Sequence, residues 1–111
     1  MLTAIFLSLP NYAQTLALGV ERPDIYLPLL ANKRVGLVVN QASLSKGENT
    51  IDLLLRQGVR LVKLFGLEHG VRGDGGAGEP LPDSIDEKTG LPIVSLYGKT
   101  YKPTPEMLKD I

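Results

Sequence analysis

Three β-branched, apolar runs separated by helix-type segments predict an α/β fold, a partial Rossmann-like parallel sheet with flanking helices. The first run, RVGLVVN at Arg34–Asn40, is almost continuously apolar, which suits a strand buried on both faces of a parallel sheet. RLVKLFG at Arg60–Gly66 is a second strand candidate, and PIVSLYG at Pro92–Gly98 is a third. The order of elements is therefore the alternation of helix and strand that is typical of layered α/β proteins.

The helix expected between the first two strands has a recognisable start and stop. Ser45 stands three residues before Glu48 and ahead of an apolar run, which is the capping-box pattern. Gly58 is placed as the C-terminal stop. The nineteen residues between Asn40 and Arg60 are enough for a crossover, so the two strands should be parallel and joined right-handedly.

Two more helices are expected near the ends of the chain. The segment Asp24–Lys33 should form a short helix that Pro28 interrupts or starts. Thr104 and Pro105 read as an N-cap followed by proline at the first helical position. That last helix has barely two turns before Ile111, and three buried-type strands leave exposed sheet edges. We therefore expect the chain to be the first part of a larger α/β protein.

The first twenty residues are expected to lie outside this fold. They contain an apolar run at Leu2–Leu9, too short to span a bilayer, and Ala13 is a small residue suited to cleavage. The pattern resembles a secretory signal peptide, although no Lys or Arg precedes Arg22. We predict a signal remnant at 1–20, a domain at 21–111 and an exported protein. A buried N-terminal strand or helix is the alternative.

The composition argues against several functional classes. Twelve Lys and Arg balance twelve Asp and Glu without a run of either sign, so neither a nucleic-acid footprint nor a membrane-surface patch is expected. The absence of cysteine removes disulfides, thiolate metal sites and cysteine nucleophiles. The single histidine, His69, excludes a multi-histidine metal site within the chain. We expect no metal and no cofactor.

Glycine dominates the segment FGLEHGVRGDGGAGE at Phe65–Glu79, where it takes six of fifteen positions. Gly73, Gly75 and Gly78 match the dinucleotide fingerprint G-x-G-x-x-G letter for letter. That fingerprint works only where the glycines join a strand directly to a helix. Here Glu-Pro-Leu-Pro follows Gly78 and cannot continue a helix. A nucleotide-binding half-domain is therefore kept only as an alternative.

Polar residues follow the carboxyl ends of the predicted strands, where ligands bind in parallel α/β sheets. Asn40 follows the first strand, Glu68 and His69 the second, and Tyr97–Lys99 the third. Glycines on both sides of Glu68 let the backbone turn sharply, so its carboxylate is a candidate general acid or base. Arg72 could grip an anionic group on a ligand. A surface carboxylate and a structural histidine are the alternatives.

Three long and unusual elements mark the chain: GLEHGVRG at Gly66–Gly73, DEKTGLPIVSLYGKTYKPTPEML at Asp86–Leu108 and KRVGLVVNQASL at Lys33–Leu44. Together they resemble the exo-β-N-acetylmuramidase family known as NamZ, from about Glu21 to the last residue. The resemblance implies a Rossmann-like domain followed by a smaller C-terminal domain, with the active site between them. It also implies an exported or periplasmic bacterial glycosidase that removes terminal N-acetylmuramic acid from peptidoglycan fragments in cell-wall recycling.

The resemblance gives individual residues a role. Glu68, in the E-H-G element, is the implied catalytic carboxylate, and Asn40 and His69 would line the same cleft. N-Acetylmuramic acid carries a lactyl carboxylate that Arg72 could bind and an acetamido group that could act as an internal nucleophile. Should the reaction use a second protein carboxylate instead, the candidates are Asp74, Glu79 and Asp86.

The chain departs from the family pattern in two respects. The family chain is several times longer, and Leu67 stands where proline is common. Because the C-terminal wall of the cleft would be missing, we expect the 111-residue chain alone to have little or no glycosidase activity. A non-catalytic truncated remnant or a sugar-binding module is the alternative.

Overall fold

A four-stranded sheet with the order β1-β4-β6-β5 organises the computed structural model, which describes Met1 and residues 15–111. Strands β1, β4 and β6 run parallel, and β5 pairs antiparallel with β6 at the edge. Their bounds are Val35–Val39 for β1, Leu61–Gly66 for β4, Ser84–Ile85 for β5 and Pro92–Ser95 for β6. The predicted α/β class and the three parallel strands are confirmed, and β5 is an addition. The predicted signal remnant lies mostly outside the described residues.

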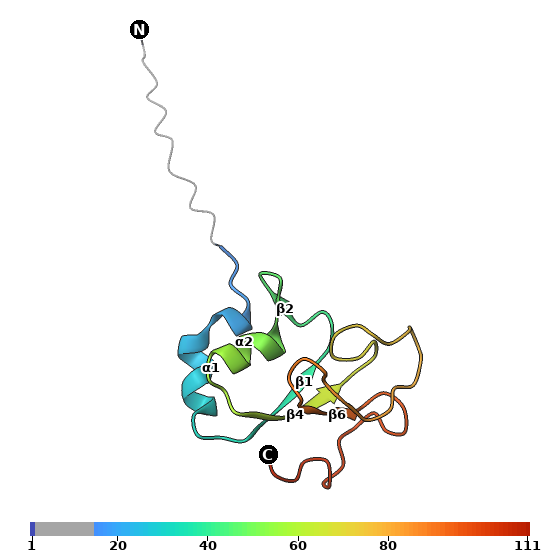
Figure 1. Cartoon of the computed structure of the whole chain (residues 1–111). Coiled ribbons are helices and arrows are strands. Elements are labelled where there is room, and N and C mark those ends of the chain that lie inside the picture. The colour runs from blue at the N-terminus through green and yellow to red at the C-terminus, as the bar shows by residue number, and fades with distance from the viewer. Residues whose placement is uncertain (2–14) are drawn as a thin grey trace.

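Two helices lie side by side against the sheet (Figure 1). Helix α1 spans Pro23–Leu30 and contains Pro28 in its interior, and a 3₁₀ turn at Gly19–Glu21 precedes it. Helix α2 spans Thr50–Arg56 and provides the crossover between β1 and β4. Within the described residues, neither helix has the length that a bilayer crossing requires.

The core lies between the helices and one face of the sheet. Leu64 of β4 is fully buried and stands in register with Leu37 of β1 on one side and Ile93 of β6 on the other. Ile51 and Leu54 of α2 pack onto this row of side chains. Apolar residues that alternate along each strand therefore meet the apolar side of α2, which fixes the position of the strand ends.

The start of α2 differs from the prediction. Ser45 and Glu48 pair with each other in a short hairpin, β2 at Leu44–Ser45 and β3 at Glu48–Asn49. The turn between them has positive φ angles, 50° at Lys46 and 81° at Gly47. The predicted capping box is therefore wrong. Asn49 is the N-cap instead, because its Oδ1 accepts the Ile51 N–H at 2.9 Å.

The end of α2 follows the prediction. Gly58 has a φ of 82°, in the left-handed region that glycine adopts without steric cost, and its N–H donates to the Leu55 carbonyl at 3.0 Å. The next residue, Val59, is buried in the core. The chain can therefore leave the helix and enter β4 within a few residues.

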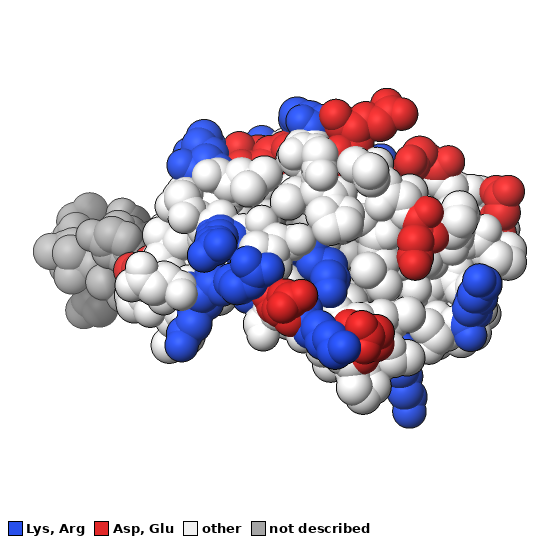
Figure 2. All heavy atoms as spheres, turned by 60° about the horizontal axis from the view of Figure 1, so that its bottom comes forward, with Lys and Arg blue, Asp and Glu red and all other residues white. Residues whose placement is uncertain are grey.

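The second face of the sheet meets the last residues of the chain. Gly36 leaves space there for two side chains, since a Cβ at this position would lie 3.0 Å from Phe65 Cε2 and 3.1 Å from Ile111 Cδ1. Val38, next along β1 on the same face, is 56% exposed. The expected burial of the first strand on both faces is therefore only partly realised. The face of the molecule shown in Figure 2 carries both basic and acidic side chains.

The predicted helix beginning at Pro105 is wrong, because residues 105–110 form consecutive turns. The expected cap contact exists, with the Met107 N–H 3.4 Å from Thr104 Oγ1. Two backbone carbonyls of this segment accept hydrogen bonds from side chains of the sheet region. The Lys63 ammonium of β4 donates to the Met107 carbonyl at 2.6 Å, and Arg34 Nε donates to the Asp110 carbonyl at 2.6 Å. These contacts bind the segment to the sheet.

Candidate functional site

Strand β4 ends in a tight turn that presents Glu68. The Gly70 N–H donates to the Leu67 carbonyl at 2.9 Å and closes the turn. His69, its third residue, has a φ of 67°, a left-handed conformation that is uncommon outside glycine. Glu68 follows the last residues of β4, an interior strand of the sheet, and is half-buried. It therefore lies at the carboxyl edge of the sheet, where ligands of parallel sheets bind.

The glycine-rich segment folds back over this turn. The Gly75 N–H donates to the His69 carbonyl at 3.0 Å, and His69 Nδ1 lies 3.1 Å from the Gly75 carbonyl. A carbonyl only accepts, so Nδ1 carries the proton and Nε2 of a neutral ring is the acceptor. Glu68 Oε1 in turn accepts the Gly78 N–H at 2.8 Å. The loop backbone therefore positions both the carboxylate and the imidazole.

The same glycines do not form a nucleotide fingerprint. Gly73 and Gly78 have φ angles of 86° and 71° and serve as turn residues. The chain continues from Gly78 to β5 without a helix, and both α-helices of residues 15–111 precede β4. The segment therefore lacks the helix N-terminus that would receive a pyrophosphate.

Tyr97, which follows β6, lies near Glu68 and contacts a second tyrosine. Burial raises the pKa of the Tyr97 phenol, and the negative charge of the nearby Glu68 raises that pKa further. The rings of Tyr97 and Tyr101 meet edge to face, with centroids 5.5 Å apart and planes at 87°. Tyr101 is 70% exposed. The sequence placed the Tyr97 segment at this edge, but nothing in its local pattern singled out the aromatic pair.

Asn40 is held in a turn of its own after β1. Its Oδ1 accepts the Ala42 N–H at 3.1 Å and the Ser43 hydroxyl at 3.3 Å, as in an Asx turn. The next residue, Gln41, packs against the loop that follows β4. A Cβ at Gly73 would lie 3.0 Å from Gln41 Cβ, so the two loops touch there. Gln41 Oε1 is buried without a hydrogen-bond partner among the described residues.

Arg72 is bound by two carboxylates. Its Nε and Nη2 donate to Asp86 at 2.6 and 2.8 Å, and its Nη1 and Nη2 donate to Asp52 at 3.2 and 3.1 Å. Asp86 also accepts the Thr89 hydroxyl, and Asp52 accepts Lys88 Nζ at 2.7 Å. The geometry favours an anchoring role for Arg72 over the expected grip on an anionic ligand, because a ligand would have to displace a carboxylate. The guanidinium ties the loop after β4 to α2 and to the residues after β5.

These ion pairs shift the acidity of both carboxylates. The hydrogen bonds from Arg72 lower the pKa of Asp86 against the opposing effect of its burial, and the Thr89 hydroxyl lowers it further. Hydrogen bonds from Arg72 and then from Lys88 lower the pKa of Asp52. Both groups therefore favour the ionised form in the folded chain.

Acid should weaken the fold through these two groups. A folded-state pKa below the unfolded value, about 3.9 for Asp, gives a stability contribution that is complete above the unfolded pKa and lost as the pH falls through the folded pKa. We expect the free energy of unfolding, measured by urea titration, to decline as the pH falls from about 5. Asp86→Asn should flatten this decline, and an unchanged slope would exclude Asp86 as its source.

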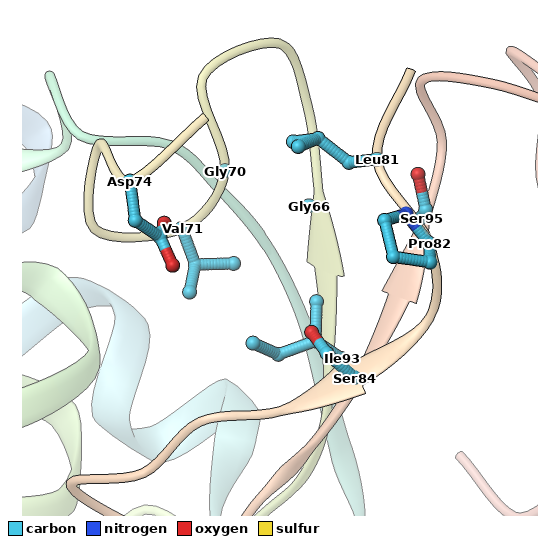
Figure 3. A pocket seen from close by; sticks show the side chains of 9 residues that line it. All are labelled: Gly66, Gly70, Val71, Asp74, Leu81, Pro82, Ser84, Ile93 and Ser95. Atoms are coloured by element: carbon cyan, nitrogen blue, oxygen red, sulfur yellow. The ribbon is translucent and has the colours of Figure 1, made fainter. Parts of the chain in front are cut away.

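The three candidate second carboxylates have different surroundings. Asp86 is 4% exposed and committed to Arg72. Glu79 Oε2 accepts the Gly76 N–H at 3.2 Å within the glycine-rich segment. Asp74 lines a cavity of about 220 Å³ between the turn after β4 and strand β6 (Figure 3). Only Asp74, of these three, both faces a cavity and lacks a hydrogen bond from the described residues.

Comparison with known proteins assigns the chain to a family. A model of the family described as "Exo-beta-N-acetylmuramidase NamZ, N-terminal" matches residues 35–111. The peptidoglycan beta-N-acetylmuramidase NamZ of Bacillus subtilis (strain 168) is 50% identical over 91 residues, which cover 80% of this chain and 22% of that protein.

Two crystal structures from Bacteroides fragilis NCTC 9343 share the fold. The DUF1343 family protein BF0371 superposes with a TM-score of 0.71 at 48% identity, over 84% of this chain and 23% of that one. The DUF1343 family protein BF0379 superposes with a TM-score of 0.65 at 34% identity, over 83% and 22% of the two chains. The chain thus spans less than a quarter of the length of each relative.

Proposed function

The chain belongs to the exo-β-N-acetylmuramidase NamZ family, and from that premise we propose that it forms the acid-bearing part of a peptidoglycan glycosidase. The substrate is a peptidoglycan-derived glycan or muropeptide, from whose non-reducing end the enzyme releases N-acetylmuramic acid. The single observation that carries the proposal is the position of Glu68, on a tight turn at the carboxyl edge of an interior strand.

Glu68 is proposed to act as the general acid. Glycoside hydrolysis needs a proton on the leaving oxygen, and a carboxylic acid at the edge of a cleft is the usual donor. The Gly78 N–H binds Oε1 at 2.8 Å, which leaves Oε2 to carry the proton toward a sugar. His69 and Asn40 would bind sugar hydroxyl groups. Arg72 supports the loop rather than the substrate.

Export is part of the proposal. The peptidoglycan layer lies outside the cytoplasm, and the apolar run at Leu2–Leu9 suits a secretory signal. Cell fractionation of the host, with detection of this chain in the periplasm or medium, tests it. Retention in the cytoplasm would contradict export without affecting the chemistry.

The catalytic proposal is tested by release of N-acetylmuramic acid from a chromogenic N-acetylmuramide. The chain is assayed alone and as a chimera in which residues 21–111 replace the matching segment of the B. subtilis relative. We expect turnover by the chimera and little or none by the chain alone, because the relative supplies the rest of the protein. A folded chimera that binds the substrate without turnover would favour a sugar-binding module instead.

A further inference from the structure

The cavity beside the Glu68 turn has an amphipathic lining. Its apolar wall is formed by Val71 after β4, Leu81 before β5 and Ile93 of β6, and its polar groups include Asp74 and Ser95 (Figure 3). Its volume of about 220 Å³ far exceeds the roughly 10–15 Å³ that one water molecule requires. A small group with one apolar end and one hydrogen-bonding end therefore fits there.

Two glycines of the E-H-G-x-R-G-D-G segment create this lining. A Cβ at Gly70 would lie 2.7 Å from Asp74 Oδ1, so the missing side chain allows the carboxylate to lie over the turn. A Cβ at Gly75 would lie 2.7 Å from Leu81 Cδ2, so the second glycine admits the leucine. These two glycines thus bring an acceptor and an apolar wall together, a role that involves no phosphate ligand.

Asp74 is an exposed carboxylate at the edge of this cavity, where it can accept a hydrogen bond from a ligand. Its side chain is turned toward Val71 and the cavity in Figure 3. It receives no hydrogen bond and forms no ion pair within the described residues, unlike Asp86 and Glu79 nearby. An ionised carboxylate only accepts hydrogen bonds, so a ligand that binds Asp74 must offer a donor.

We propose that this cavity is the subsite for the acetamido group of the sugar, with the methyl group against Val71, Leu81 and Ile93 and the N–H donating to Asp74. The proposal rests on the glycosidase function given above, because the segment from Gly66 to Gly70 joins the cavity to the turn that carries Glu68. It makes Asp74 a specificity residue that separates 2-acetamido sugars from sugars with a 2-hydroxyl group.

Binding to the isolated chain tests the subsite without any turnover. N-Acetylglucosamine and glucose are titrated separately into ¹⁵N-labelled protein, because both sugars lack the lactyl carboxylate. We expect N-acetylglucosamine to shift the backbone amides of Gly70, Val71 and Ile93, and glucose to leave them unchanged. Equal shifts with both sugars, or shifts confined to other regions, would overturn the proposal.

Variants of Asp74 sharpen the result. Asp74→Ala should weaken N-acetylglucosamine binding about tenfold, which is the size of one charge-assisted hydrogen bond. Asp74→Asn should recover most of this loss, since its side-chain oxygen still accepts. Asp24→Asn, an exposed substitution on α1, is the matched control and should bind as the parent does. Unchanged binding by Asp74→Ala would remove Asp74 from the subsite.

The experiments can refute the subsite proposal and the glycosidase proposal independently of each other. A chimera that releases N-acetylmuramic acid while Asp74→Ala leaves binding unchanged would refute the subsite alone. Selective, Asp74-dependent binding of N-acetylglucosamine together with an inactive chimera would refute the glycosidase alone.

Discussion

Replacing Glu68 by glutamine in the active chimera is expected to lower kcat about 10²–10⁴-fold, the usual contribution of a general acid. Glutamine has nearly the shape of glutamate, and its oxygen can accept the Gly78 N–H as Glu68 Oε1 does. The turn should therefore keep its structure. The amide cannot supply the proton that the leaving oxygen needs, so the loss should appear in kcat rather than in substrate affinity.

Two comparisons isolate the acid role. The loss should be smaller for a nitrophenyl leaving group, which departs without protonation, than for a sugar alkoxide. Glu106→Gln is the control, because Glu106 is 76% exposed and pairs with Lys109 outside the loop that carries Glu68. Its kcat should stay within roughly twofold of the parent, well below the effect of losing a general acid. Equal kinetics for Glu68→Gln and the parent would exclude Glu68 from the mechanism.

Replacing Arg72 by methionine is expected to reduce the free energy of unfolding by about 3 kcal/mol, at the lower end of values for breaking a buried ion pair. The Arg72 side chain is 25% exposed and that of Asp86 only 3%. Without the guanidinium, Asp86 would remain a buried charge whose other side-chain contact comes from Thr89. Urea denaturation monitored by circular dichroism measures the change.

Arg56→Met supplies the control for this loss. Arg56 also pairs with a carboxylate, Glu48, at 2.7 Å, but its side chain is 63% exposed. An exposed pair contributes about 0–1 kcal/mol, so the control should cost far less than Arg72→Met. Similar losses for the two variants would show that the Arg72 network does not anchor the loop. A stable Arg72→Met chimera with reduced affinity only for substrates bearing the lactyl group would return Arg72 to the binding site.

The sequence predicted the strands well because their signal is local. A nearly continuous β-branched run marks β1, a mostly apolar run marks β4, and Gly58 ends α2 with the φ that its position implied. The start of α2 was missed because Ser45 and Glu48 fit a capping box and a hairpin equally by spacing. Lys46 and Gly47 decide for the hairpin, since they turn the chain before a helix can begin.

Contacts distant in sequence account for the remaining differences. No local pattern shows that Lys63 will take the carbonyl of Met107, which lies 44 residues further along the chain. The same limit applied to Arg72, whose partners Asp52 and Asp86 lie 20 residues before it and 14 after it. The position of Glu68 could be predicted from the sequence, because ligand-binding residues of parallel sheets follow the carboxyl ends of the strands. That rule does not depend on contacts between distant residues.

The left-handed backbone at His69 restricts which residues can evolve at that position. Glycine, asparagine, aspartate and histidine tolerate this conformation best, whereas valine, isoleucine and threonine would clash with their own main chain. Backbone sterics therefore limit the residue types that can replace the imidazole beside Glu68. Drift at this site should run through those few residues, and a β-branched replacement should require a remodelled turn.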